Sequence, residues 1–332
     1  MTGIVRGASL ALLLAALIAS VAAAPPSTQD ARLPVPDPQT RAKAAKLIAE
    51  LFQTDLMQIK NAADEAAYAA KLLKAATDTA DDPAGRFELF EEARSSAAHA
   101  GDVETAMQAV GQISQAYRAN GLGLAAQTLS VVVAHAGPRD APRALPYIDN
   151  FVGQSVGADR FDLATLGTDL AMDAARKSQD PTLIAQAEAF AKETDSLKAA
   201  FEGVPAAGAK LAQNPSDADA NLMIGRFYCL YKGEWGALLP LSHGSDPALK
   251  DLAAKDLAGA TDPHAMMLIG DGWWDWAAVQ SGMPRQNARG RAVFWYQKAA
   301  PQLQGLSKLV VEHRLFEFSA EHPESATPPH RE

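Results

Sequence analysis

The sequence predicts an all-α protein, an α-solenoid of antiparallel helix hairpins stacked on one another. Apolar residues recur at steps of three and four along most of the chain, which places them on one face of a helix. Most of them are Ala and Leu, which favour helices, and the alternation typical of strands is absent. Asp-Pro pairs, which start helices, occur at Asp37, Asp82, Asp180, Asp246 and Asp262.

Each Asp-Pro pair marks a helix start for a physical reason. The Asp side chain accepts a hydrogen bond from an unpaired backbone N–H of the first turn, and Pro at the first helical position has no N–H to leave unpaired. The one run of β-branched residues, 131–133, lies between alanines and is assigned to the end of a helix. Helices before the C-terminal third are expected at 38–52, 63–76, from 83 past 93, 102–117, 122–134, 141–156, 161–175 and 180–211.

The most distinctive stretch runs from Thr261 to Leu315 and holds four of the chain's five tryptophans. The helix that starts at Asp262 carries one apolar face made of Met266, Ile269, Trp273 and Ala277. Gly270 lies inside this helix, where Gly costs about 1 kcal/mol relative to Ala. We therefore expect a second helix to approach closely at Gly270.

The second helix carries Ala292, Tyr296 and Ala299 on one face. Small residues that face large rings are typical of an antiparallel helix pair of the tetratricopeptide type. Ile269 and Gly270 match the Leu-Gly pair in the first helix of that motif. A loop at 279–286 makes this repeat longer than the usual ~34 residues. The pattern recurs at Ile224 and Gly225, 45 positions upstream, with an extra short helix expected at 246–257.

In these segments the chain resembles a family of exported, mostly uncharacterised bacterial proteins built from tetratricopeptide-like helical repeats. The resemblance covers most of 81–315 and implies a tetratricopeptide-like fold, with no catalytic residues and no indicated substrate. The motifs that carry it lie at 225–235, 241–250, 270–275 and 295–299.

Five regions are expected along the chain. A short start with Arg6, an apolar run and small residues up to Ala23 are typical of a secretory signal. An uncleaved anchor is the alternative, because 8–24 is at the short limit of the ~17 residues that can span a bilayer. The regions are a signal peptide at 1–23, a Pro-rich linker at 24–37, an N-terminal helical-repeat region at 38–212, C-terminal tetratricopeptide-like repeats at 213–320 and a disordered tail at 321–332.

The chain is acidic, with a net charge of −9. Cleavage of the signal would remove only Arg6 and leave 29 basic and 39 acidic residues, a net charge of −10. Without a basic cluster, nucleic acid and anionic membrane surfaces are not expected as partners. We expect an exported protein, in the periplasm, the cell envelope or the medium, with no stable membrane insertion after cleavage.

Groups suited to catalysis or metal binding are sparse. The single cysteine, Cys229, is expected to be a small buried residue, and an intermolecular bridge or a reactive thiol is the alternative. The seven histidines have no metal-ligand spacing, so neither a metal nor a cofactor is predicted. Asp271 and Asp275 lie one helical turn apart. In a cleft they would suit acid and base catalysis, but a solvated strip or a partner for a nearby arginine, such as Arg289 or Arg291, is the favoured interpretation, and no enzyme is predicted.

The remaining candidate site is the aromatic cluster, which consists of Phe227, Tyr228, Trp235, Trp273, Trp274, Trp276, Trp295 and Tyr296. It is interpreted first as the core of the repeats, and otherwise as a surface on which Trp274 or Trp276 grips a peptide or a sugar. The candidate binding residues are Trp273, Trp274, Trp276, Asp271 and Asp275. Because stacked hairpins form a concave surface, the sequence favours a non-enzymatic scaffold or adaptor that binds other proteins. A carbohydrate- or small-ligand-binding protein that uses the tryptophans is the alternative.

Overall fold

The structure is a computed structural model that describes residues 30–321. Its regular structure is helical, and residues 30–321 contain no strand, only an isolated parallel bridge between Leu33 and Tyr117. The expected all-α class is confirmed. The predicted signal segment, the first part of the linker, and the tail after Glu321 lie outside the described residues.

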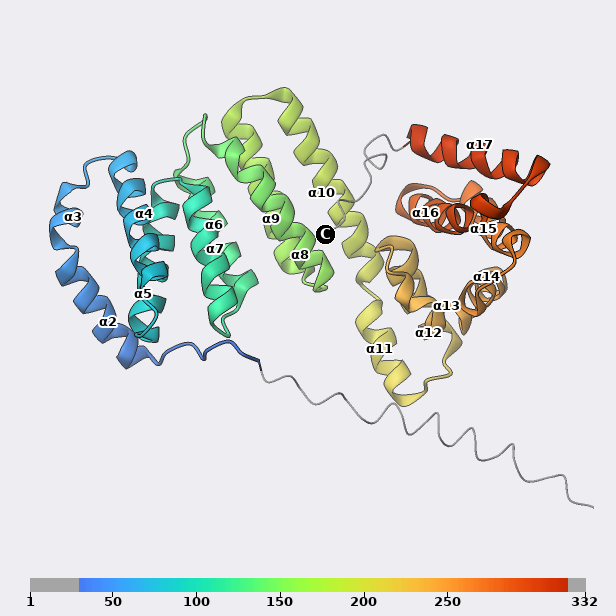
Figure 1. Cartoon of the computed structure of the whole chain (residues 1–332), viewed down its shortest axis with the longest axis horizontal. Coiled ribbons are helices and arrows are strands. Elements are labelled where there is room, and N and C mark those ends of the chain that lie inside the picture. The colour runs from blue at the N-terminus through green and yellow to red at the C-terminus, as the bar shows by residue number, and fades with distance from the viewer. Residues whose placement is uncertain (1–29, 322–332) are drawn as a thin grey trace, which may run out of the picture. The chain divides into compact units, whose positions relative to one another are not determined.

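The chain divides into two compact units, Met1–Ala191 and Lys192–Glu332, each of which is described by itself. The helices of the first unit follow one another side by side in chain order, and each packs on the next from α4 to α9 (Figure 1). They are α2 (Pro38–Leu51), α3 (Gln53–Gln58), α4 (Ala62–Asp78), α5 (Pro83–His99), α6 (Val103–Ala116), α7 (Gly121–His135), the short 3₁₀ helix η1 (Ala141–Ala144), α8 (Leu145–Gly157) and α9 (Phe161–Ser178).

The boundary between the units lies within α10 (Pro181–Phe201), earlier in the chain than the change at residue 212 expected from the sequence. The second unit continues with α11 (Val204–Gln213), α12 (Ala218–Gly225), the π-helical turn η2 (Arg226–Tyr231), η3 (Trp235–Ala237), α13 (Leu238–Ser242), α14 (Pro247–Ala258), α15 (Pro263–Ala278), α16 (Gly282–Ala299), η4 (Ala300–Gln302) and α17 (Gly305–Glu321). Glu321, expected to begin the tail, is the last residue of α17.

All five Asp-Pro pairs start helices as predicted. The side chains of Asp37, Asp82, Asp180, Asp246 and Asp262 each accept a hydrogen bond from a backbone N–H of the following turn, at distances between 2.8 and 3.1 Å. The proline comes first in each helix. Local chemistry at these pairs therefore decides where five of the helices begin.

The helix expected over 180–211 is two helices, α10 and α11, and this expectation was wrong. α10 ends at Phe201, and Pro205 occupies the first turn of α11. A proline inside one continuous helix would remove a backbone hydrogen bond and clash with the preceding turn. The start of α11 lies close against α12, because a Cβ at Gly203 would stand 2.4 Å from the sulfur of Met223.

One hydrophobic core cluster of the first unit is built mainly from α4, α5 and α6. Leu72, Phe90, Ile113 and Tyr117 are fully buried in it. The Tyr117 hydroxyl donates a hydrogen bond to the carbonyl of Pro83, at 2.7 Å. Part of the expected linker packs here as well, because the Leu33 N–H donates to the carbonyl of Ala116, at 2.8 Å.

In the second unit, α15 and α16 pack as an antiparallel pair. A Cβ at Gly270 would stand 2.6 Å from Cε1 of Tyr296 and 3.2 Å from the carbonyl oxygen of Ala292. Four residues later on α15, the ring of Trp274 lies under Arg289, earlier on α16. The close approach expected at Gly270 is confirmed.

Gly225 likewise allows another helix, α13, to approach closely. A Cβ at Gly225 would stand 2.5 Å from the backbone nitrogen of Leu241. Both Ile-Gly pairs singled out in the sequence therefore mark places where another helix lies too close for a side chain.

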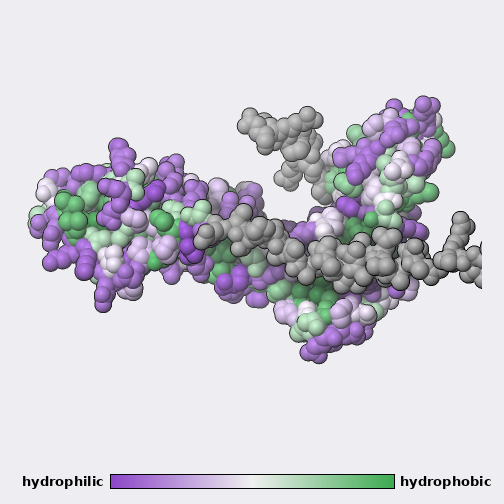
Figure 2. Space-filling model, turned by 60° about the horizontal axis from the view of Figure 1, so that its bottom comes forward, coloured by the Kyte–Doolittle hydropathy of each residue, from purple (hydrophilic) through white to green (hydrophobic). Residues whose placement is uncertain are grey.

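On the face drawn in Figure 2, hydrophilic residues predominate and apolar residues form patches between them. Within 30–321, no helix has both the length and the apolar character needed to cross a bilayer.

Candidate functional site

Trp273 belongs to a buried ion-pair network. It is fully buried, and its indole N–H donates to Oδ2 of Asp256, at 2.6 Å. Arg291 binds both oxygens of the same carboxylate, at 2.8 Å from Nε and 2.5 Å from Nη2. The Asp256 side chain is 0% exposed and that of Arg291 is 15% exposed. Arg291 therefore pairs with Asp256 on α14 and not with Asp271 or Asp275, for which it was one of the two arginines suggested from the sequence.

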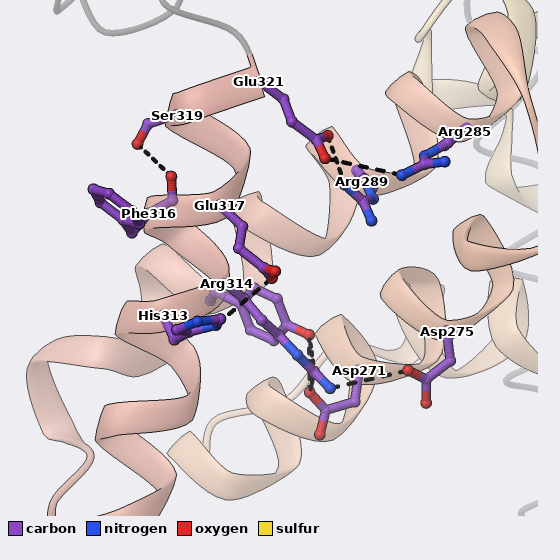
Figure 3. A network of polar contacts seen from close by, with 11 residues as sticks. Asp271, Asp275, Arg285, Arg289, His313, Arg314, Phe316, Glu317, Ser319 and Glu321 are labelled. Carbon is purple, nitrogen blue, oxygen red and sulfur yellow. Dashed lines mark hydrogen bonds and ion pairs between the residues drawn. The ribbon is translucent and has the colours of Figure 1, made fainter.

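The two carboxylates of α15 are bound by an arginine from α17 (Figure 3). Nη1 of Arg314 donates to Oδ1 of Asp271, and its Nη2 lies 3.9 Å from Oδ1 of Asp275. The hydroxyl of Tyr296 donates to the same oxygen of Asp271, at 2.8 Å. Burial, followed by this bond to Asp271, raises the pKa of Tyr296 well above its usual range.

This arrangement fits an ion-pair role for Asp271 and Asp275. Two donors bind Asp271, whereas the side chain of Asp275 is 74% exposed. Both parts of the favoured interpretation apply: Asp271 is the partner of an arginine, and Asp275 is largely solvated, but the arginine is Arg314 and not Arg289 or Arg291. Arg289 instead bonds to Glu321 at the end of α17, at 2.6 Å.

The other two candidate tryptophans differ in exposure. Trp274 is 8% exposed, and the guanidinium carbons of Arg289 and Arg314 lie 4.5 and 5.7 Å from the centre of its ring. Trp276 is half-buried and contacts Trp273 edge to face, with ring centres 6.5 Å apart. Of Trp273, Trp274 and Trp276, only Trp276 has a substantial part of its surface open to a ligand.

Tertiary packing brings two histidines together that are far apart in the sequence. The rings of His99, on α5, and His135, on α7, lie 5.0 Å apart. Their Nδ1 atoms lie 2.8 and 2.9 Å from the carbonyls of Ser95 and Val131. Across the part of the chain that the structure describes, no three His, Cys, Asp or Glu residues come together as a metal site.

Cys229 is fully buried on η2. Burial raises the pKa of its thiol to about 12. Because the thiolate is the reactive form, this position suits a packing residue and disfavours the alternative of a reactive thiol.

A groove of about 850 Å³ lies between α6, α7 and α8 in the first unit. Its floor is apolar and includes the buried residues Val110, Ala125 and Phe151. Its walls carry exposed polar side chains, with Glu104, Gln108 and Gln115 on α6 and Asn150 and Gln154 on α8.

Gly111 keeps the middle of this groove open. It lies inside α6 and lines the groove, and no described atom beyond its own helix backbone and chain neighbours stands within 4 Å of the position of a Cβ. A larger side chain at this position would therefore project into the groove.

The sequence analysis did not single out the groove residues, although a signal was present. Glu104, Gln108, Gly111 and Gln115 follow steps of four, three and four, which places them on one face of α6. Three of the four are uncharged, unlike the usual charged outer face of a helix. Only the packing of α7 and α8 beside α6 turns this face into the wall of a groove.

We compared the chain with models of protein families, with curated proteins and with solved structures. None of the three comparisons finds a match. The geometry of the groove and of the aromatic cluster is therefore the evidence that bears on function.

Proposed function

We propose that this is an exported, non-enzymatic helical-repeat protein that binds a segment of another protein in the groove between α6, α7 and α8. In this proposal the helices form a tetratricopeptide-like α-solenoid, as in the exported bacterial family that the sequence resembles. The protein acts as a scaffold or adaptor in the cell envelope. The antiparallel packing of α15 on α16 and the chain-order stacking of α4 to α9 support this architecture.

The groove is the observation that carries the proposal. Its volume of about 850 Å³ is in the range of ligand-binding clefts. It combines an apolar floor with exposed amides, a combination that buries apolar surface and also fixes the orientation of a ligand. Polypeptide segments offer both apolar side chains and backbone hydrogen-bonding groups to such a surface.

The state of the candidate catalytic groups also supports a binding role. Asp271 is bound by Arg314 and Tyr296, and Asp256 is bound by Arg291 and Trp273. These carboxylates are engaged in holding helices together. Their geometry favours a structural role over acid and base catalysis.

Carbohydrate binding by the tryptophans has less support. A sugar ring stacks on the open face of an aromatic side chain, whereas Trp273 is fully buried and Trp274 is covered by two arginines. Of the three candidate tryptophans, Trp276 alone is partly exposed. Quenching of tryptophan fluorescence by glycans, lost in Trp276→Ala, would favour this alternative.

The proposal is tested by crosslinking in the producing cell. A photoreactive amino acid replaces Gln108, an exposed residue of the groove, and in a matched strain replaces Gln127, an exposed glutamine of α7 that does not line the groove. We expect discrete protein adducts from position 108 that are absent from position 127. Equal adduct patterns from both positions, or no adduct from position 108, would count against the groove as a partner site.

A further inference from the structure

Resting on the proposed function, we infer that the groove takes an extended polypeptide segment whose backbone is bound by side-chain amides and which carries a basic residue at the Glu104 end. The inference names the conformation and the charge of the partner segment. It depends on two rows of side chains, one on each wall of the groove.

The row on α6 spans the length of a short extended segment. Gln108 and Gln115 lie seven residues apart on one face of α6. At a rise of about 1.5 Å per residue, their backbones are separated by about 10 Å. An extended chain advances about 3.3 Å per residue, so this distance corresponds to about three residues of a bound segment.

The row on α8 faces it from the other wall. Asn150 and Gln154 lie one helical turn apart, and Nε2 of Gln154 donates a hydrogen bond to Oδ1 of Asn150. The side-chain amides of Asn and Gln contain both a donor and an acceptor. Two rows of such amides suit an extended backbone, in which N–H and C=O groups alternate in direction.

A helical segment and a sugar fit the groove less well. In a helix the backbone groups are bonded to each other, so amide rows would find few partners. A sugar would stack on the open face of an aromatic ring, and the groove offers only the partly exposed ring of Tyr147, because Phe151 is buried in the floor. The extended segment is therefore the occupant that uses the two amide rows.

The charge of the groove favours a basic residue at one end. Among the described residues that line the groove, Glu104 is the only charged one. Its exposed carboxylate, in the first turn of α6, has no ion pair or hydrogen bond with another side chain in the described part of the chain. A Lys or Arg of the segment gains an ion pair there, whereas an acidic residue meets a like charge.

The test uses the full chain and a library of random decapeptides displayed on phage. Selected peptides are synthesised with a fluorescent label, and their binding is measured by fluorescence anisotropy. We expect Lys or Arg to be enriched toward one end of the selected peptides and Asp and Glu to be depleted. Glu104→Gln should weaken their binding by about two- to fivefold, as expected for an exposed ion pair, and the effect should shrink at high salt.

Two glycine variants locate the binding site. Gly111→Leu places a side chain in the groove, whereas Gly153→Leu places the same side chain at an exposed glycine of α8 that has open space and does not line the groove. We expect Gly111→Leu to weaken binding at least tenfold and Gly153→Leu to leave it unchanged. Far-UV circular dichroism checks that both variants fold, and the double variant Gln108→Ala, Gln115→Ala tests the amides without filling the groove.

Several outcomes would overturn the inference. They are enrichment of acidic peptides, peptide binding that is equal in the Gly111→Leu and Gly153→Leu variants, and a glycan panel that binds in the groove where peptides do not. If position 108 crosslinks a partner but the selected peptides bind elsewhere, the segment class is wrong and the proposed function stands. If position 108 also captures nothing, the proposed function fails with it.

Discussion

The buried carboxylate of Asp256 provides a sharp test of how the second unit is held together. Asp256→Asn keeps the shape of the side chain but removes its charge. Arg291, whose side chain is 15% exposed, would then lose its anion. One of the two carboxylate oxygens, each of which accepts a hydrogen bond, would become an NH₂ group facing another donor.

The expected loss of stability is large. Breaking a buried ion pair by removing one partner costs about 3–5 kcal/mol, because the other charge is left buried and uncompensated. Folded proteins have about 5–15 kcal/mol of stability in total. Asp251→Asn is the matched control, because Asp251 lies on the same helix and pairs with Lys255, at 2.7 Å, but both side chains are more than 60% exposed. It should cost less than about 0.5 kcal/mol.

The assay is urea unfolding followed by tryptophan fluorescence. All five tryptophans lie between residues 235 and 295, so fluorescence reports on the second unit. The double variant Asp256→Leu, Arg291→Met should be more stable than Asp256→Asn alone, because it leaves no unpaired charge. If Asp256→Asn and Asp251→Asn lower the free energy of unfolding equally, the reasoning about the buried pair is refuted.

Three further predictions concern close approach, thiol burial and capping. Gly270→Ala should lower the free energy of unfolding by about 1–3 kcal/mol because its methyl would crowd Tyr296, whereas Gly290→Ala, in open space on α16, should raise it by up to about 1 kcal/mol. The reverse order in urea unfolding would contradict the packing of α15 on α16. Because burial raises the pKa of Cys229 to about 12, the thiolate is scarce near neutral pH. A thiol reagent at pH about 8 should therefore label this residue only in urea, and rapid labelling of the folded protein would disprove the assignment. Asp82→Ala should cost about 1 kcal/mol, measured by thermal unfolding, while Asp82→Asn retains most of the cap, and equal stabilities of the two variants would show that the cap contributes little.

Helix starts and helix class were predictable because they depend on neighbours in the chain. The five Asp-Pro caps were located from two adjacent residues each, and all five are present. The break between α10 and α11 was missed although Pro205 is a local signal of the same kind. The need for a close helix at Gly270 was also predictable, because glycine inside a helix is unfavourable unless packing requires it.

The partners of charged residues were less predictable. The sequence offered Arg289 and Arg291 as partners for Asp271, but Arg314 takes that place and Arg291 binds Asp256. Several long side chains on neighbouring helices are long enough to reach the same carboxylate, so the sequence alone does not identify the one that binds it. The choice among them depends on how α17 and α14 pack beside α15.

By itself, the amino-acid order determined that the chain is helical, where most helices begin and that Gly270 admits a neighbouring helix. Those properties follow from hydrogen bonds and contacts within a few residues. Only the tertiary structure decided that Trp273 and Trp274 are buried and that a groove opens between α6, α7 and α8. A groove and a buried indole are properties of several helices at once, since each depends on which faces the neighbours cover and which they leave open.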